Sequence, residues 1–242
     1  MSHKQQLRRQ RNNTVINSIS KRQESILMRA VNRIKVELQN RHKGIELHWM
    51  PQWGLRDVIR MLTNAYPNVK FCDCFETSAM RPDGGVLSIV DREEKLYPIL
   101  ISEKKNQGTN DIRVQEGKPK QAKGNAIERL GKNVIGLRAA LLNESIFPFV
   151  CFGDGCDFAE DSSIVDRVKT IAMFGALNQE HLHNEGPNGM FNRGTYYFRV
   201  PEWTEEEMYE LAMDIAERSC LYYFSKYGTE RFASEGFSLR SL

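Results

Sequence analysis

Residues 97–105 read YPILISEKK, an apolar run that ends in one glutamate and two lysines. The apolar part is typical of a central β-strand, and we expect a strand over 97–103. Because successive side chains of a strand point to opposite faces, Glu103 and Lys105 project to one face and Lys104 to the other. A charged E-x-K at the end of an apolar strand is not the pattern of a generic surface strand, so it is the first candidate for a functional site.

A tight turn upstream supplies a second carboxylate. The sequence RPDGG at 81–85 precedes a predicted strand over 85–90, and a hairpin turn at 91–95 leads into the strand that ends at Glu103. If this hairpin brings Asp83 beside Glu103 and Lys105, two carboxylates and one ammonium group converge. Carboxylates are the hard oxygen ligands that Mg²⁺ prefers, and a neighbouring cation can position an attacking water. Any surface hairpin can carry these residue types, so a structural role stays open at this point.

The rest of the chain predicts helices and strands in alternation. We expect helices over 14–40 (one helix or two in series), 54–65, 125–142, 166–177 and 204–227, and further strands over 69–77, 147–153 and 195–200. Loops are expected over 108–124, 153–161 and 179–193. This order predicts an α/β fold with a mixed central β-sheet flanked by helices. We expect a single domain over 14–242, preceded by a basic, flexible arm at 1–13.

Composition narrows the class of protein. The chain has 242 residues, of which 40% are hydrophobic and 27% charged, as in soluble globular proteins. We expect no membrane segment, because no apolar run is long enough, and a cytoplasmic protein, because no apolar segment follows the basic N-terminus. Five cysteines argue against a disulfide framework. Cys72 and Cys74 share one face of an expected strand and are predicted to pack in the core.

Positive charge gathers locally although the net charge is only +3. Basic residues are dense between positions 104 and 132 and in the N-terminal arm. Locally basic segments are typical of a polyanion-binding surface, and they also occur on ordinary solvated faces.

The run GNAIER at 124–129 combines groups that can read adenine. Asn125 can pair with adenine N6 and N7 in the major groove, Glu128 can accept from the N6 amino group, and Arg129 can donate to purine N7 or to phosphate. Gly124 and Ala126 lack bulk, so the backbone can approach the bases closely. The alternative is an ordinary helix start in which Asn125 is the cap and Glu128 the third helical residue.

With these motifs in order, the chain resembles the EcoRI-type type II restriction endonucleases of the PD-(D/E)xK nuclease superfamily. The resemblance runs from about Ser78 to Phe158 and rests on RPDGG at 81–85, SEKKNQG at 102–108, GNAIER at 124–129 and ESIFPFVCF at 144–152. It implies the restriction-endonuclease-like fold and Mg²⁺-dependent hydrolysis of double-stranded DNA at a palindrome containing AATT. The expected products carry 5′-phosphates on a 5′ overhang.

The resemblance also implies roles for individual residues. Asp83, Glu103 and the backbone carbonyl of Lys104 would bind Mg²⁺, for which Mn²⁺ can substitute, and Lys105 would act on the attacking water. The catalytic set is therefore Asp83, Glu103 and Lys105. A palindromic site implies a homodimer, and a restriction enzyme implies a cognate DNA methyltransferase in a prokaryotic cytoplasm.

The resemblance fails just before GNAIER. Members of the family carry small apolar residues there, whereas this chain has Gln121, Ala122 and Lys123. These positions help to set the base pair outside AATT, so that pair can be G·C as in GAATTC, another pair, a degenerate pair, or unread. The expected DNA-binding residues are Gln121, Ala122, Lys123, Gly124, Asn125, Ala126, Glu128 and Arg129. Two other functions stay open: a structure-selective repair or recombination nuclease of the same fold, and a non-catalytic DNA-binding relative.

Overall fold

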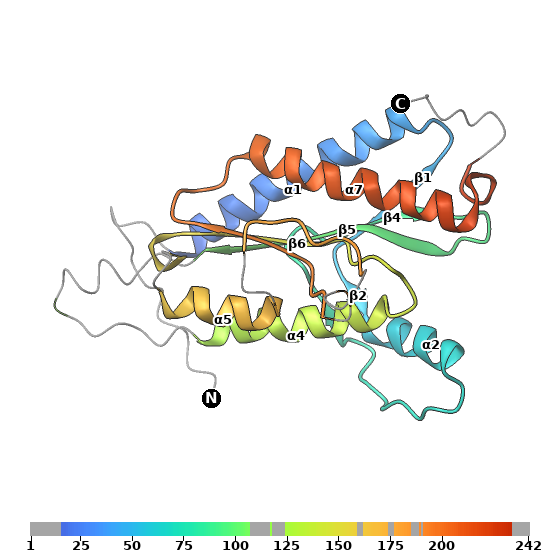
Figure 1. Cartoon of the computed structure of the whole chain (residues 1–242), viewed down its shortest axis with the longest axis horizontal. Coiled ribbons are helices and arrows are strands. Elements are labelled where there is room, and N and C mark those ends of the chain that lie inside the picture. Colours follow the sequence, from blue (N-terminus) through green and yellow to red (C-terminus); the bar gives the residue numbers. More distant parts are fainter. Residues whose placement is uncertain are drawn as a thin grey trace.

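A mixed β-sheet forms the centre of the computed structural model, which describes residues 16–106, 117, 124–158, 162–173, 177–184, 189 and 191–233. The strand order is β1-β4-β5-β6-β7, and helices lie on both faces (Figure 1). β1 (Glu46–Met50), β4 (Val86–Val90) and β5 (Leu96–Asn106) pair antiparallel. β6 (Phe149–Asp154) and β7 (Thr195–Arg199) continue the sheet parallel to β5. The predicted mixed α/β sheet is confirmed.

Long helices cover both faces of this sheet (Figure 1). One face is covered by α1 (Ile16–Arg41) and α7 (Glu205–Tyr227), and the other by α4 (Gly124–Ala140) and α5 (Ser163–Ala172). α2 (Leu55–Ala65) packs beside α4, next to a small sheet of β2 (Trp53–Gly54) and β3 (Ala79–Met80). Short 3₁₀ turns, η2 (Cys156–Phe158) and η3 (Thr229–Arg231), follow β6 and α7. α1 is one continuous helix.

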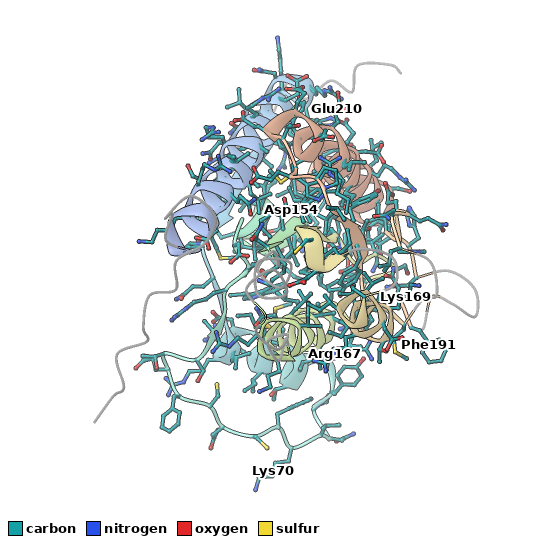
Figure 2. All side chains as sticks on the ribbon, turned by 90° about the vertical axis from the view of Figure 1, so that its left-hand side faces the viewer. Lys70, Asp154, Arg167, Lys169, Phe191 and Glu210 are labelled. Carbon is teal, nitrogen blue, oxygen red and sulfur yellow. The ribbon has the colours of Figure 1, made fainter. Side chains whose placement is uncertain are left out.

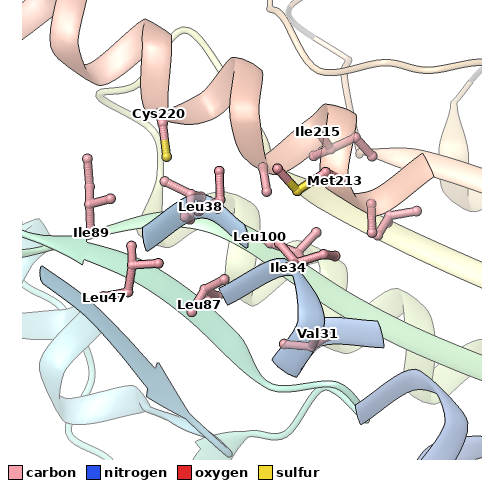
Figure 3. Close-up of a cluster of buried hydrophobic side chains, with 14 of the residues drawn as sticks. Val31, Ile34, Leu38, Leu47, Leu87, Ile89, Leu100, Met213, Ile215 and Cys220 are labelled. Carbon is pink, nitrogen blue, oxygen red and sulfur yellow. The ribbon is translucent and has the colours of Figure 1, made fainter. Parts of the chain in front are cut away.

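The face under α1 and α7 has a dense apolar core. Figure 3 shows α1 and α7 meeting over β1, β4 and β5, with Ile34, Leu38 and Leu100 among the side chains in contact. On α1 the buried apolar residues recur every three or four positions, which is the period of one helix face: Leu27, Ala30, Val31, Ile34 and Leu38. α7 begins with the predicted cap, because the Thr204 hydroxyl accepts from the Glu207 backbone and the Glu207 carboxylate accepts from the Thr204 backbone.

One extra residue in β5 decides which way the functional strand faces. Leu87 pairs with Leu100, but the next pair along is Ser88 with Pro98, so Ile99 has no partner of its own. Ile99 and Leu100 both pack into the α1/α7 core, whereas Ile101 packs on the α4/α5 side. A β-bulge of this kind shifts the register by one residue and exchanges the two faces beyond it. Beyond the bulge, alternation puts positions 103 and 105 on the α4 side of the sheet.

The parallel strands β5, β6 and β7 all end at one edge of the sheet. Parallel neighbours need a crossover connection, and here α4 joins β5 to β6 while α5 joins β6 to β7. A crossover helix runs back against its strands, so α4 begins where β5 ends (Figure 1). The carboxyl ends of β5, β6 and β7 therefore lie together with the amino end of α4.

Several expectations are wrong. The strand predicted over 69–77 is not formed; that stretch is irregular, Cys72 is exposed, and the Phe75 side chain is 83% exposed. Cys72 therefore does not pack in the core. β1 was not expected from its sequence, ELHWM. The predicted arm at 1–13 lies outside the described residues. In the described part of the chain, no helix has the length and apolarity that crossing a bilayer requires.

Candidate active site at the carboxyl end of β5

The turn at 82–85 places Asp83 against the end of β5. The Gly85 N–H donates to the Pro82 carbonyl at 2.9 Å, and the Gly84 N–H donates to the Ser102 carbonyl at 2.9 Å. Gly85 has a φ of +75°, which favours glycine. A side chain at Gly84 would collide with the Ser102 hydroxyl and with Leu27. Two successive glycines thus let the turn lie flat on β5, and Asp83 is fixed beside Glu103.

Asp83, Glu103 and Lys105 converge as predicted. The Lys105 ammonium donates to Asp83 Oδ2 at 3.2 Å and forms a short contact with Glu103 Oε1. The Asp83 backbone N–H donates to Glu103 Oε2 at 3.0 Å. The Glu103 side chain is buried, whereas Asp83 and Lys105 are partly open to solvent. The cluster thus faces outward through Asp83 and Lys105 and is closed behind Glu103.

The charges in this cluster do not balance. Burial raises the pKa of Glu103 above its usual value; the nearby Lys105 lowers it and the Asp83 carboxylate raises it, and the net pKa is about 7. Burial lowers the pKa of Lys105, but the nearby Glu103 and Asp83 raise it by more than burial lowers it, so Lys105 stays protonated. Two carboxylates share one ammonium group, and keeping the buried Glu103 ionised costs free energy because it has lost its water. An added cation would relieve this cost.

The backbone of Lys104 borders the same cluster. Ser102 exchanges hydrogen bonds with the turn at Gly84 and Gly85, and two residues later the Lys104 N–H donates to Asp83 Oδ2 at 3.1 Å. Because alternate residues of a strand direct their peptide groups to the same side, the Lys104 carbonyl also lies on the Asp83 side, beyond the end of β4. Two carboxylates, one backbone carbonyl and space for water form an all-oxygen donor set. That set fits Mg²⁺, which keeps several waters in protein sites.

The part of the chain that the structure describes holds no richer metal site. Among the described residues, no group of three or more His, Cys, Asp or Glu side chains is arranged to hold a metal ion. The candidate site therefore depends on two acidic side chains supplemented by backbone and water, which is the pattern of a hard, hydrated ion.

A third carboxylate lies within electrostatic range and was missed by the sequence analysis. Glu24 on α1 has its pKa raised by partial burial and next by the negative charge of Asp83, while Lys105 and Lys21 lower it. Glu24 sits one residue after the buried Gln23 on a helix that otherwise looked like a plain amphipathic element. Nothing in its spacing pointed to the site, because its distance from Asp83 depends on how α1 crosses the sheet.

The structure describes the DNA-reading candidates only in part. The motif at 124–129 forms the first turns of α4, where Ile127 and Leu130 are buried and Arg129 between them is exposed. Gln121, Ala122 and Lys123 lie outside the described residues, and so do the side chains of Gly124, Asn125, Ala126 and Glu128. The crossover still brings the start of this motif to the edge of the sheet at which Glu103 and Lys105 lie.

Comparisons with known proteins point in one direction. The family model described as restriction endonuclease EcoRI matches residues 10–165. The chain is 33% identical over 178 residues to the type II restriction enzyme RsrI of Cereibacter sphaeroides, with 60% of this chain and 64% of that enzyme covered. It is 26% identical over 142 residues to the type II restriction enzyme EcoRI of Escherichia coli, with 55% of this chain and 51% of that enzyme covered. The chain thus spans less than two thirds of either relative.

Proposed function

Because the chain belongs to the EcoRI restriction endonuclease family, we propose that it is a type II restriction endonuclease that cuts double-stranded DNA at a palindrome containing AATT. Family membership agrees with the resemblance that its motifs indicate. The observation that carries the proposal is the convergence of Asp83, Glu103 and Lys105 at the carboxyl end of β5. A binding protein without catalysis has no need of a buried carboxylate that shares one lysine with a second, partly exposed carboxylate.

Each residue of this cluster has a task that its position supports. Asp83 and Glu103 would hold Mg²⁺ together with the Lys104 carbonyl, and Mn²⁺ can substitute for it. When bound, the ion would polarise the scissile phosphate and acidify a coordinated water. Lys105 is cationic and partly open to solvent, so it can orient the attacking water and stabilise charge on the phosphate. Attack in line at phosphorus leaves a 5′-phosphate and a 3′-hydroxyl.

Recognition of AATT is proposed for the start of α4. Asn125 can donate to adenine N7 and accept from N6 in the major groove, Glu128 can accept from N6, and the exposed Arg129 can donate to a purine or a phosphate. The N-terminus of a helix also favours a negatively charged partner such as the DNA backbone. The base pair outside AATT would be read by Gln121, Ala122 and Lys123. This pair can be G·C, as in GAATTC, another pair, a degenerate pair, or unread.

A two-fold arrangement completes the proposal. A palindrome presents the same contacts twice, so a homodimer of this chain would place one active site on each strand and cut with a 5′ overhang. Each subunit would be a single domain over 14–242, with the arm at 1–13 adding positive charge. The relatives are type II restriction enzymes of bacteria. This supports a role in a prokaryotic cytoplasm beside a DNA methyltransferase that protects the host site.

The experiment uses short duplexes that differ only around one central site. Duplexes with AATT inside each possible outer base pair are incubated with the protein and Mg²⁺, next to a duplex with the same composition and no AATT. We expect cleavage of at least one palindromic AATT duplex, in both strands, and none of the scrambled control.

Two outcomes would overturn the proposal in favour of other functions. Cleavage of branched DNA irrespective of its sequence would identify a structure-selective repair or recombination nuclease. Retardation of AATT duplexes in a gel without hydrolysis, in Mg²⁺ and in Mn²⁺, would identify a non-catalytic DNA-binding relative.

A further inference from the structure

The residue between Glu103 and Lys105 has a side chain with a separate set of contacts. Lys104 faces the α1/α7 side of the sheet and is 2% exposed, although lysine is rarely buried. Its Nζ lies 2.6 Å from Oδ2 of Asp154, which is fully buried. The ion pair therefore lies directly behind the catalytic face of β5, on the far side of the same strand.

Asp154 joins several parts of the fold at one carboxylate. Besides Lys104, its oxygens accept from the Asn106 side chain at 2.7 Å, the Trp203 backbone N–H at 3.0 Å and the Gln23 side chain at 3.3 Å. These donors come from β5, from the approach to α7 and from α1. Figure 2 shows Asp154 at the end of the sheet, between the two helix layers.

The catalytic end of β5 needs such an anchor because it lacks a strand on one side. The ladder between β4 and β5 ends at the pair of Val86 and Ile101, followed by the hydrogen bonds between Gly84 and Ser102. From Glu103 onward β5 pairs only with β6. On the open side the strand is held by the Asp83 side chain, which is itself a proposed metal ligand.

We propose that the Lys104–Asp154 ion pair is a positioning element, which fixes the Lys104 backbone and the flanking Glu103 and Lys105 for metal binding and hydrolysis. This inference rests on the function proposed above. Pulling the Lys104 side chain toward Asp154 sets the twist of the strand at residue 104. That twist aims the Lys104 carbonyl at the cation and holds Glu103 and Lys105 on the α4 face.

Stability alone does not account for the pair. Replacing a buried ion pair with apolar residues of similar size often leaves stability unchanged or raises it, whereas breaking one partner is costly. A methionine at position 104 is similar in length to lysine, and it would leave Asp154 with the neutral donors of Asn106, Gln23 and the Trp203 backbone. A charge pair adds direction instead, since the ammonium must point at one carboxylate. Outer partners of metal ligands act in this way in other metal sites.

The test compares four variants with the wild-type chain. D154N keeps the shape at position 154 but removes its charge and replaces one acceptor oxygen with an NH2 group. K104M removes the ammonium group, and K104M/D154N removes both charges. D91N is the matched control, because Asp91 is also fully buried and paired with an arginine, but at the other end of β5. Melting temperature, Mn²⁺ affinity by electron paramagnetic resonance, AATT-duplex binding in Ca²⁺ and single-turnover cleavage in Mg²⁺ are measured for each.

We expect D154N and K104M to lose about 10- to 100-fold in Mn²⁺ affinity and in cleavage rate. Duplex binding in Ca²⁺ should change by less than about threefold, since no DNA contact is removed. The double variant should recover the melting temperature that D154N loses, yet stay slow and bind Mn²⁺ weakly. D91N should melt earlier and keep both Mn²⁺ affinity and cleavage rate.

Recovery of cleavage and Mn²⁺ affinity in the double variant would overturn the inference, because the pair would then act through stability alone. Folded D154N with wild-type affinity and rate would overturn it as well. If the wild-type chain binds Mn²⁺ and cuts no DNA, the proposed function fails, and the Mn²⁺ affinities of the variants still decide the role of the pair.

Discussion

The two ends of the β4–β5 hairpin each bury a carboxylate and treat its charge in opposite ways. Burial by itself raises the pKa of Asp91 at the turn, but hydrogen bonds from Arg231 and from the Lys95 and Glu93 N–H groups outweigh burial and leave this pKa below its usual value. Burial also raises the pKa of Glu103 at the other end, and there the single nearby Lys105 does not compensate for it.

The difference separates a structural carboxylate from one suited to bind a cation. Both Asp91 oxygens accept from groups of the chain itself: two backbone N–H groups, the Tyr97 hydroxyl and the Arg231 guanidinium. At the other end, two carboxylates must share one ammonium group. Asp91 and Glu103 are both buried and both paired with a cation, so these two features alone would suggest a structural role for each. The direction of the pKa shift distinguishes them, because only the end near Glu103 favours an added positive charge.

The largest expected effect separates the two ends by activity. D83A should lower the single-turnover cleavage rate by about three orders of magnitude or more, because it removes one of the two proposed carboxylate ligands. Specific binding to an AATT duplex in Ca²⁺ should stay measurable. D91N, at the other end, should cut at nearly the wild-type rate once folded. Retained cleavage by D83A would show that the metal site is assigned to the wrong residues.

The next largest effect is on stability, and here the Asp91 end of the hairpin should matter more than the Glu103 end. D91N should lower the free energy of unfolding by about 1–3 kcal/mol, because an NH2 group replaces one of the two buried oxygens that accept hydrogen bonds from the chain. Urea unfolding followed by circular dichroism measures this change. K95A, which removes a side chain at the same turn and keeps the backbone N–H to Asp91, is the control. An unfolding midpoint equal to that of the wild type would contradict a structural role for Asp91.

For E103Q, the change in the free energy of unfolding should have the opposite sign to that of D91N. Glu103 has a pKa of about 7 in the folded chain, against a usual 4.5, so the ionised carboxylate destabilises the metal-free protein. As the pH rises from 4.5 toward 7, the unfolded chain loses this proton first, and the folded state loses stability. In the presence of EDTA at pH 8, E103Q should therefore be more stable than the wild type. Saturating Mg²⁺ should reverse that order, and an E103Q that is less stable without metal would refute this view of the site.

The smallest effect is the pH dependence of the Asp91 contribution. Its pKa lies below the usual 3.8 in the folded chain, so its stabilisation is present above the pKa of the unfolded chain and is lost as the pH falls through the folded pKa. The stability difference between wild type and D91N should be constant above about pH 5 and narrow below it. A difference that instead narrows between pH 6 and pH 8 would point to another titrating group.

The sequence predicted most of what positions the site. Glu103 and Lys105 were found by strand alternation and Asp83 by its turn, since each signal is local. The bulge at Ile99 was not predicted, because it depends on pairing with β4 rather than on β5 alone. The bulge selects the helix layer that Glu103 faces, so sequence alternation could show that Glu103 and Lys105 share a face without showing which one.

The failures have a common physical cause. The stretch at 69–77 alternates like a strand, but it finds no neighbouring strand to pair with, and local strand preference is weak without pairing. Asp154 belongs to the acidic stretch at 153–161, whose composition predicts a loop, yet it ends β6 and is fully buried. Glu24 was missed because its position near Asp83 depends on the crossing of α1. Tertiary contacts decided all three, and the sequence near each residue does not encode them.

Sequencing the ends of digested DNA tests the central claim most directly. Genomic DNA is incubated with the wild-type protein and Mg²⁺, and with D83A as the control for contaminating nucleases. We predict that wild-type ends map to palindromes containing AATT and carry 5′ overhangs with 5′-phosphates, and that the same reads give the outer base pair that Gln121 to Lys123 would set. Ends without a common sequence, or equal cutting by D83A, would contradict site-specific hydrolysis at the Asp83–Glu103–Lys105 site.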